Sequence, residues 1–550
     1  MKNKRAKTLD SLPKPVLVGI IFVSVTLAFV VQERLNTQRG ELSNAYLEPL
    51  QNAPPMLVLT TQALSGFRGI ISSYLWLRAN EAQLDKRYQE QMQLSQWVSQ
   101  LQPTVPTVWV NRAWNMAYNL SVKYPNQETR WKYVQEGVRL LRDEGIKYCP
   151  QEPLIYHELA WIFQHKIGHN MDDHHRFYKQ QWMNSMTAVL WENQDEAQAL
   201  RGVPNFDELI NPPTPEVAAR VSNLRKIYKL DPREMKAVAM KYGRVTLPNG
   251  DVVDALDWRI PETHSIYWAH MGLKRCANNP SRESAMRKVE RIIYQSMMYA
   301  FERGKLIQDP ATGKLGFQDV TKGMGAVAGG TDSGLKASWW TIPNLDITEN
   351  THKAYIEMVK RANEMRGEDT YSTFESAHFN FMRRAINWFF YYHREDEAIK
   401  WLEICANRYP EKFVYYPGYT PGDGFKKGKV NLDEFVFYKY EDDLKRGNYE
   451  KTVGLIRGLL IRHFLFLAEG DEVQGQKYHD KFKDVHTRYV NRFRSASENR
   501  VRLLRREAFE VMVLTDLLAN EGPIRAAQLR TALGLKADEW PKYNPPGSGQ

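Results

Sequence analysis

An internal repeat constrains the fold of this chain more than any other feature of its sequence. The segments 102–118 and 149–165 carry matching prolines, aromatic residues and small residues at a spacing of 47 residues. The matched pairs are Pro103 and Pro150, Pro106 and Pro153, Trp109 and Tyr156, Ala113 and Ala160, Trp114 and Trp161, and Met116 and Phe163. A single repeat of this length cannot bury its own apolar face, so the pattern predicts helix pairs stacked on neighbours.

The segment 379–410 predicts one such helix pair in detail. Small residues at Ala385 and Ala398 would let two antiparallel helices approach closely, and Pro410 would end the pair. Larger residues would fill the space between neighbouring helices: Met382, Phe389 and Leu402. Ile386 and Cys405 stand at further packing positions of the two helices. Residue sizes therefore predict two packed helices joined by a short turn.

These patterns resemble the tetratricopeptide repeat (TPR) family over residues 60–190 and 376–490. In that family a proline stands six residues before the first large packing position of the next unit, as Pro103 and Pro150 stand before Trp109 and Tyr156. The usual period is about 34 residues, and we expect the extra residues in segment 121–133, between the helices of one unit. The resemblance implies a mainly α, TPR-like α-solenoid with a concave surface for docking other proteins.

An apolar run at residues 16–31 predicts a transmembrane helix. Sixteen helical residues span about 24 Å, and flanking residues could extend this toward a bilayer core of about 30 Å. Five basic residues precede the run: Lys2, Lys4, Arg5, Lys7 and Lys14. This asymmetry predicts a single-pass protein of the inner membrane, with a cytoplasmic N-terminus and its bulk in the periplasm. The alternative is a cleaved signal peptide, but the only small-residue pattern, Thr26-Leu27-Ala28, lies inside the run.

The rest of the chain divides by composition. A β-hairpin is expected with Asn249-Gly250 as its turn, and a Gly-rich loop at 323–334. The predicted segments are a basic tail at 1–14, the anchor at 15–32, a connector at 33–55, helical repeats at 56–195, an irregular insertion at 196–350, helical repeats at 351–522, and a short helix with a disordered tail at 523–550.

Histidines and carboxylates are concentrated between residues 157 and 175. They are His157, Glu158, His165, His169, Asp172, Asp173, His174 and His175. Such a density can bind a divalent transition metal, with His165, His169, His174 and His175 as the candidate ligands. The alternative is a polar corner between two helices, where Asp172 or Asp173 caps the second helix. The sequence predicts no cofactor, and the metal is the exception that this cluster leaves open.

No catalytic signature emerges elsewhere. The Gly-rich loop lacks the GK[ST] ending of a phosphate-binding loop, and neither HExxH nor GxSxG occurs. The three cysteines, Cys149, Cys276 and Cys405, form no CxxC motif, and Cys149 and Cys405 are expected in the core. An enzyme is therefore not the favoured prediction.

Composition and charge complete the expectation. A hydrophobic content of 43% fits a folded protein, and the net charge of +11 is not gathered on one long basic face, so no nucleic-acid partner is expected. We predict a membrane-anchored scaffold that docks protein partners in the cell envelope, with Trp109, Trp114, Tyr156 and Trp161 on its binding face. The alternatives are a metal-binding protein or enzyme centred on residues 157–175, and a lipid- or glycan-binding protein that uses its aromatic residues.

Overall fold

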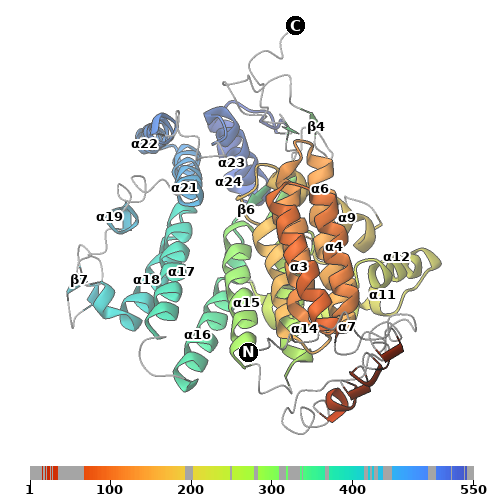
Figure 1. Ribbon diagram of the computed structural model, residues 1–550. Coiled ribbons are helices and arrows are strands. Elements are labelled where there is room, and N and C mark those ends of the chain that lie inside the picture. Colours follow the sequence, from red (N-terminus) through yellow and green to blue (C-terminus); the bar gives the residue numbers. More distant parts are fainter. Residues whose placement is uncertain are drawn as a thin grey trace, which may run out of the picture. The chain divides into compact units, whose positions relative to one another are not determined.

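The structure is a computed structural model, and it shows a mainly α-helical protein (Figure 1). It describes residues 15–16, 19, 22–24, 26–27, 29–34, 67–192, 202–247, 250–277, 283–308, 318–319, 335–336, 339–365, 371–413, 419–420, 424–425, 432–437, 449–492, 503–521, 523–537 and 539–541. Two compact units account for the chain. The N-terminal unit comprises Met1–Leu159 with Met271–Arg287, and the C-terminal unit comprises Ala160–His270 with Lys288–Gln550.

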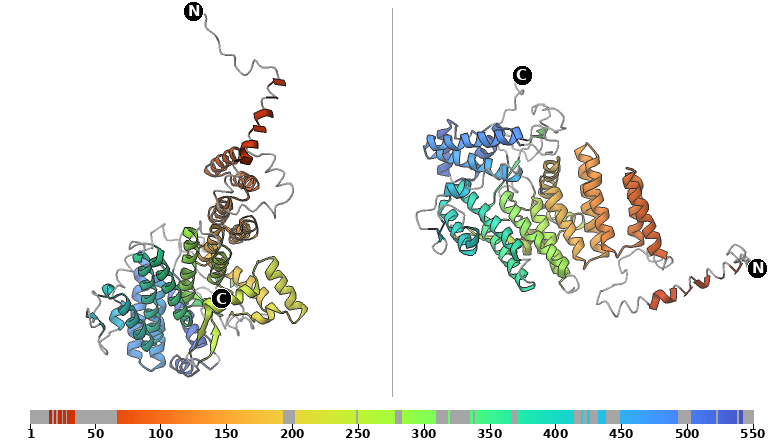
Figure 2. Two further views of the ribbon diagram at one scale, coloured as in Figure 1. Left: turned by 90° about the horizontal axis from the view of Figure 1, so that it is seen from below. Right: turned by 60° about the vertical axis from the view of Figure 1, so that its left-hand side comes forward.

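The N-terminal unit is built from antiparallel helices that lie side by side in Figures 1 and 2. They are α3 (Arg68–Leu84), α4 (Tyr88–Leu101), α5 (Pro106–Trp114) with the π-helix η3 (Asn115–Leu120), and α6 (Gln127–Arg139) with the π-helix η5 (Leu140–Gly145) and α7 (Ile146–Tyr148). Local signals explain the starts of two helices. Pro106 occupies the first turn of α5, and the Asn126 side chain caps α6 by accepting a hydrogen bond from the Thr129 backbone.

The internal repeat is confirmed by the geometry of its two copies. Helix α8 (Pro153–Trp161) and the π-helix η6 (Ile162–Ile167) begin and end 47 residues after α5 and η3. The leading aromatic residue makes the same hydrogen bond in each copy: Trp109 Nε1 donates to the Pro103 carbonyl at 2.7 Å, and the Tyr156 hydroxyl donates to the Pro150 carbonyl at 2.9 Å. The second copy continues into α9 (His175–Leu190).

The extra residues of the long repeat lengthen the helices. We expected segment 121–133 to be an insertion between the helices, and that prediction is wrong. Residues 121–123 form the 3-10 helix η4 (Ser121–Lys123), and α6 starts at Gln127, which leaves only residues 124–126 as a link. Each extra turn adds apolar surface to a helix that is already packed, whereas a long loop would bury little.

The middle of the chain combines helices with the expected hairpin. Strands β1 (Arg244–Thr246) and β2 (Val252–Asp254) pair antiparallel, and Gly250 adopts a φ of +90°, which favours glycine. The surrounding helices are α11 (Phe206–Ile210), α12 (Pro215–Lys226), α13 (Pro232–Val238), the π-helix η7 (Ala239–Gly243), α14 (Pro261–Arg275) and α15 (Glu283–Arg303). Thr214 and Asp231 cap α12 and α13 with their side chains.

The C-terminal part is a succession of helices, several of which pack on the next in sequence (Figure 1). They are α16 (Thr348–Met365), α17 (Tyr371–Tyr391), α18 (Glu395–Arg408), α19 (Leu432–Phe437), α21 (Tyr449–Ala468), α22 (Glu472–Arg492), α23 (Arg506–Asn520) and α24 (Pro523–Ala532). The helix pair expected at 379–410 is confirmed as α17 and α18, and Ala385 and Ala398 are fully buried between large neighbours.

Short strand pairs accompany these helices. Strand β3 (Lys305–Gln308) pairs antiparallel with β6 (Trp339–Ile342), β4 (Gln318–Asp319) with β5 (Leu335–Lys336), and β7 (Tyr419–Thr420) with β8 (Gly424–Phe425). The Gly-rich loop at 323–334, the basic tail at 1–14, most of the connector and the final residues lie outside the described residues.

The described positions of the predicted anchor are helical, and Phe22, Val23 and Leu27 among them are well exposed. Among the residues that the structure describes, no helix combines the length and the apolar character needed to cross a bilayer.

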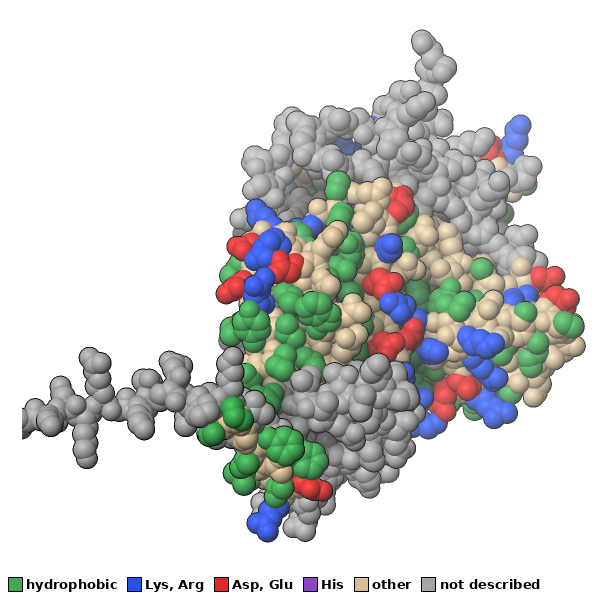
Figure 3. Space-filling model, turned by 45° about the vertical axis from the view of Figure 1, so that its right-hand side comes forward, with side chains coloured by type: hydrophobic (Ala, Val, Ile, Leu, Met, Phe, Trp, Pro, Cys, Tyr) green, Lys and Arg blue, Asp and Glu red, His purple; other side chains and the backbone are tan. Residues whose placement is uncertain are grey.

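Apolar side chains also reach the surface of the folded units. Figure 3 shows one face of the molecule, where exposed hydrophobic side chains lie among acidic and basic ones. In the N-terminal unit, α3 exposes Ile70, Tyr74, Leu77 and Leu84, which follow the spacing of a helical face.

Candidate functional site

A basic cavity lies within the C-terminal unit. Its volume is about 340 Å³, and it is lined by residues from α9, α15, α17, α19, α21 and α23 and by neighbouring loop residues. Among its described lining residues, seven are cationic and one, Glu302, is acidic. The cations are Arg176, Lys179, Arg303, Arg383, Arg384, Lys451 and Arg457. A concave, partly apolar surface with this excess of positive charge is suited to an anionic group.

Helix α9 contributes a chain of polar contacts to the lining of the cavity. The Lys179 ammonium donates to Asn170 Oδ1 at 3.0 Å and to His175 Nδ1 at 3.1 Å. Burial lowers the pKa of His175 well below its usual value, and the nearby charges of Lys179, Arg176 and Arg303 lower it further. His175 is therefore neutral at pH 7, and its neutral ring can accept the hydrogen bond from Lys179.

Helix α15 contributes Arg303, which forms a buried ion pair with Glu262 of α14. Arg303 is 8% exposed, and its Nε donates to Glu262 Oε1 at 2.8 Å. The guanidinium also lies over the ring of Tyr299, 4.7 Å from its centroid. These contacts orient the Arg303 side chain where it borders the cavity.

Helix α17 presents adjacent arginines, of which Arg384 binds the acidic lining residue. Arg384 forms an ion pair with Glu302, and this carboxylate raises the pKa of Arg384. Arg384 also approaches the Met298 sulfur at 3.5 Å. The protein thus already places one carboxylate against a cavity arginine.

Apolar and aromatic residues complete the lining. Arg457 of α21 lies over the Trp388 ring at 5.8 Å from its centroid. Gly458 is required beside it, because a Cβ there would lie 2.3 Å from the Tyr391 ring, so glycine lets α21 approach α17. The apolar lining residues are Trp388, Tyr391, Val436, Tyr449, Val453, Leu455, Leu504, Phe509 and Met512.

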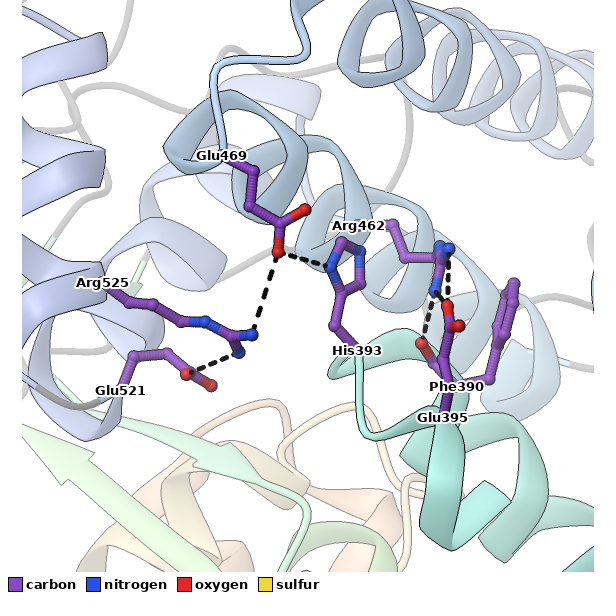
Figure 4. A network of polar contacts seen from close by, with 7 residues as sticks. All are labelled: Phe390, His393, Glu395, Arg462, Glu469, Glu521 and Arg525. Carbon is purple, nitrogen blue, oxygen red and sulfur yellow. Dashed lines mark hydrogen bonds and ion pairs between the residues drawn. The ribbon is translucent and has the colours of Figure 1, made fainter. Parts of the chain in front are cut away.

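A polar network fixes the corner between α17 and α18 against α21 and α24 (Figure 4). Arg462 donates to the Phe390 carbonyl at 2.7 Å and lies 3.4 Å from Glu395. Glu469 accepts from His393 at 3.3 Å and lies 3.8 Å from Arg525. These contacts hold in place the end of α17 that carries the cavity residues Trp388 and Tyr391.

The predicted metal ligands do not all share one site. His165 stacks on Trp161 at 4.6 Å and on His169 at 5.9 Å between ring centroids, and burial lowers the pKa of His165. Only His175 of the four lines the cavity. Within the described ranges, no group of three or more His, Cys, Asp or Glu side chains could hold a metal ion. Metal binding by His165, His169, His174 and His175 stays a prediction.

The corner between η6 and α9 supports the alternative interpretation of this cluster. Asp172 accepts from the His174 backbone at 2.9 Å and forms an ion pair with Lys166 at 2.5 Å. Both side chains are nearly fully buried. Asp172 therefore fixes the turn that precedes α9. The N-cap residue of α9 is His174, without a side-chain cap hydrogen bond, so the expected capping by Asp172 or Asp173 is wrong.

The four predicted partner-binding aromatic residues differ in exposure. Trp109 and Tyr156 are buried, at 4% and 0% exposure, and they hold the repeat together through the hydrogen bonds given above. Trp114 is 42% exposed and stacks on Tyr118, whereas Trp161 is half-buried against His165. Of this set, Trp114 offers the most surface to a partner.

The cavity residues escaped prediction from the sequence, although α21 carried a signal. Residues 455–467 are mostly apolar, and Arg457 and Arg462 stand among them. A charge on that part of the helix would have to be buried. Known proteins give no further guide: no family model matches the chain, and no curated protein matches it.

Proposed function

We propose that this protein is a membrane-anchored, TPR-like scaffold of the cell envelope that docks a partner protein by holding an acidic segment in the basic cavity. The observation that carries the proposal is the charge of the lining, seven cationic side chains against one carboxylate. An acidic segment would replace water around these cations and gain charge-assisted hydrogen bonds.

Burial strengthens the attraction between the lining cations and a bound carboxylate. Lys179, Arg303 and Arg457 are each at least nine-tenths buried. Charges in a partly desolvated cavity interact more strongly with an incoming anion than charges in water do. A cationic lining also selects against basic or neutral segments, because like charges repel and unpaired polar groups are costly to bury.

The scaffold and anchor parts of the proposal rest on other features. Two copies of one helix pair with the same aromatic-to-carbonyl hydrogen bond support a repeat architecture. The anchor is supported by the apolar run at 16–31 with its basic flank, and by the exposure of Phe22, Val23 and Leu27. These features favour an N-terminus in the cytoplasm and a periplasmic scaffold.

The test is binding of a fluorescent hexaglutamate peptide to the full chain in detergent, read by fluorescence anisotropy. We expect saturable binding that weakens as salt is raised, because counter-ions screen the attraction. Lys451→Glu reverses one lining charge and should weaken binding about tenfold, equivalent to about 1.4 kcal/mol. Lys477→Glu makes the same charge change on α22, outside the cavity lining, and should leave binding unchanged.

Two results would overturn the proposal. Equal weakening by Lys451→Glu and Lys477→Glu would mean that net charge alone attracts the peptide. The docking function would also be ruled out by two negative results together. Hexaglutamate would not bind, and crosslinked co-purification from native membranes would capture no partner crosslinked to residues of the cavity.

A further inference from the structure

The helices that line the basic cavity supply side chains of different chemistry. The lining residues from α9 and α15 are all polar or charged: His175, Arg176, Lys179, Glu302 and Arg303. The lining residues from α19 and from the chain around α23 are all apolar: Val436, Leu504, Phe509 and Met512. The lining therefore changes from cationic to apolar according to the helix that supplies it.

Helix α17 spans this change within one element. Its lining residues Asn380, Arg383, Arg384 and Asn387 are polar, and the next two, Trp388 and Tyr391, are aromatic. Asn380 and Trp388 stand eight residues apart, which is about 12 Å along a helix. Helix α21 adds residues of both kinds, and its Arg457 lies over Trp388.

Lining residues of both kinds are withdrawn from solvent. The cations Lys179 and Arg303 are at most 9% exposed, and the apolar residues Phe509 and Met512 are at most 5% exposed. A carboxylate gains most beside desolvated cations, and an apolar group gains by leaving water beside apolar side chains. A purely acidic ligand would use only the cationic lining residues.

We infer that the cavity takes an amphipathic acidic segment, in which carboxylates contact the lining cations of α9 and α15 and a bulky apolar side chain a few residues away packs against Phe509 and Met512. This inference rests on the proposed docking function and specifies the partner sequence. The Glu302–Arg384 ion pair favours carboxylates as the anionic group, because the protein itself holds one there. A volume of about 340 Å³ suits a few side chains of a peptide.

Two fluorescent peptide amides of equal charge test the polarity of the site on the full chain. One has the sequence Glu-Glu-Glu-Gly-Ser-Gly, and the other has Glu-Glu-Glu-Gly-Leu-Phe. The Kd of the second peptide should be at least tenfold lower, which corresponds to about 1.4 kcal/mol of binding free energy. A third peptide, Lys-Lys-Lys-Gly-Leu-Phe, should not bind.

Variants assign each part of the peptide to one set of lining residues. Met512→Ala should abolish most of the tenfold advantage of the Leu-Phe peptide and leave the Gly-Ser-Gly peptide unchanged. Leu518→Ala is the matched control, because it is buried on the same helix outside the cavity lining. Arg176→Gln should weaken both acidic peptides by the same factor. Thermal unfolding of each variant confirms that it is folded.

The outcomes separate this inference from the function on which it rests. Equal binding of both acidic peptides to the wild-type chain overturns the amphipathic inference and leaves acidic docking intact. If neither peptide binds but phosphatidylglycerol vesicles are bound through Arg176 and Met512, an anionic lipid is the ligand and both proposals fail. Loss of the Leu-Phe advantage in Leu518→Ala as well as in Met512→Ala would overturn the placement of the apolar side chain.

Discussion

The two units bury very different side chains. Among its described residues, the N-terminal unit buries one charged residue, Glu152, and its core is otherwise apolar or mildly polar. The C-terminal unit buries many: Lys166, Asp172, Lys179, Asp257, Arg259, Glu262, Arg303, Arg457, Arg462 and Asp516. Both units are helical, so the difference does not come from the type of secondary structure.

This contrast identifies the unit in which the fold must compensate buried charge. Burying a charge costs free energy that packing alone does not return, whereas an apolar core of helix pairs is stable without it. Several buried charges of the C-terminal unit are paired locally, such as Asp257 with Arg259, and others border the basic cavity. The predictions below therefore compare a unit held by apolar packing with a unit that also depends on buried charges.

The largest effect of a single substitution should follow from breaking a buried pair in the C-terminal unit. Asp172→Ala leaves the Lys166 ammonium without its carboxylate, and we expect the free energy of unfolding to fall by about 3–5 kcal/mol. Urea unfolding measures the change. Asp172→Asn, which keeps an acceptor for the His174 backbone, should lose less. A loss under 1 kcal/mol would show that this pair is solvated and would weaken the contrast.

Acid should destabilise the C-terminal unit selectively. Burial lowers the pKa of His378 to about 3, and those of His264 and His463 to about 4. Unfolded histidine titrates near 6.5, so the unfolded chain binds protons first as the pH falls. The stability that these rings contribute is complete above pH 6.5 and is lost toward pH 4, by about 3 kcal/mol for each ring.

Hydrogen exchange at pH 7 and pH 4.5, corrected for intrinsic rates, resolves this effect by unit. Protection should fall in the helices of the C-terminal unit and change little in the N-terminal unit, whose one histidine is His157. His378→Phe should flatten the pH dependence. An equal loss of protection in both units would contradict the prediction.

A smaller effect is expected from the repeat itself. Tyr156→Phe removes the hydrogen bond to the Pro150 carbonyl and the contact of the hydroxyl with Arg275 at 3.4 Å, both within the N-terminal unit. We expect a loss of about 1 kcal/mol in chemical denaturation. Tyr148→Phe, whose ring stacks on Trp109, is the control and should be close to neutral. If both variants lose the same amount of unfolding free energy, the hydrogen bond of the repeat does not stabilise the unit specifically.

The smallest change in unfolding free energy is expected from removing a surface ion pair of the N-terminal unit. Arg139 and Glu136 pair across one helical turn at 2.6 Å, and the arginine side chain is 54% exposed. Glu136→Ala should change the free energy of unfolding by less than about 0.5 kcal/mol, because solvent screens the pair. A change several times larger, measured by the same denaturation assay, would mean that charge matters in both units and would remove the contrast.

Local patterns predicted the helices well, and they failed where distant segments meet. Ala385 and Ala398, small residues in two amphipathic helices, identified the α17–α18 pair, and Gly250 identified the hairpin. The cavity draws on residues from Asn170 to Met512, and no periodicity relates positions so far apart. Apart from Arg457, whose apolar stretch indicated a buried charge, each of its arginines, taken alone, looks like part of a solvated face. His175 was singled out for metal binding, but its place beside Lys179 and Arg303 follows only from the fold.

The two copies of the internal repeat each contain a π-helix at the same position. Each π segment follows a nine-residue α-helix and holds six residues, in η3 and again in η6. A π segment in the middle of a helix records an inserted residue that local packing has accommodated. The π segment therefore belongs to the repeated unit, since it occupies the same place in both copies. The unit also keeps one hydrogen bond, although its leading aromatic residue is Trp109 in one copy and Tyr156 in the other.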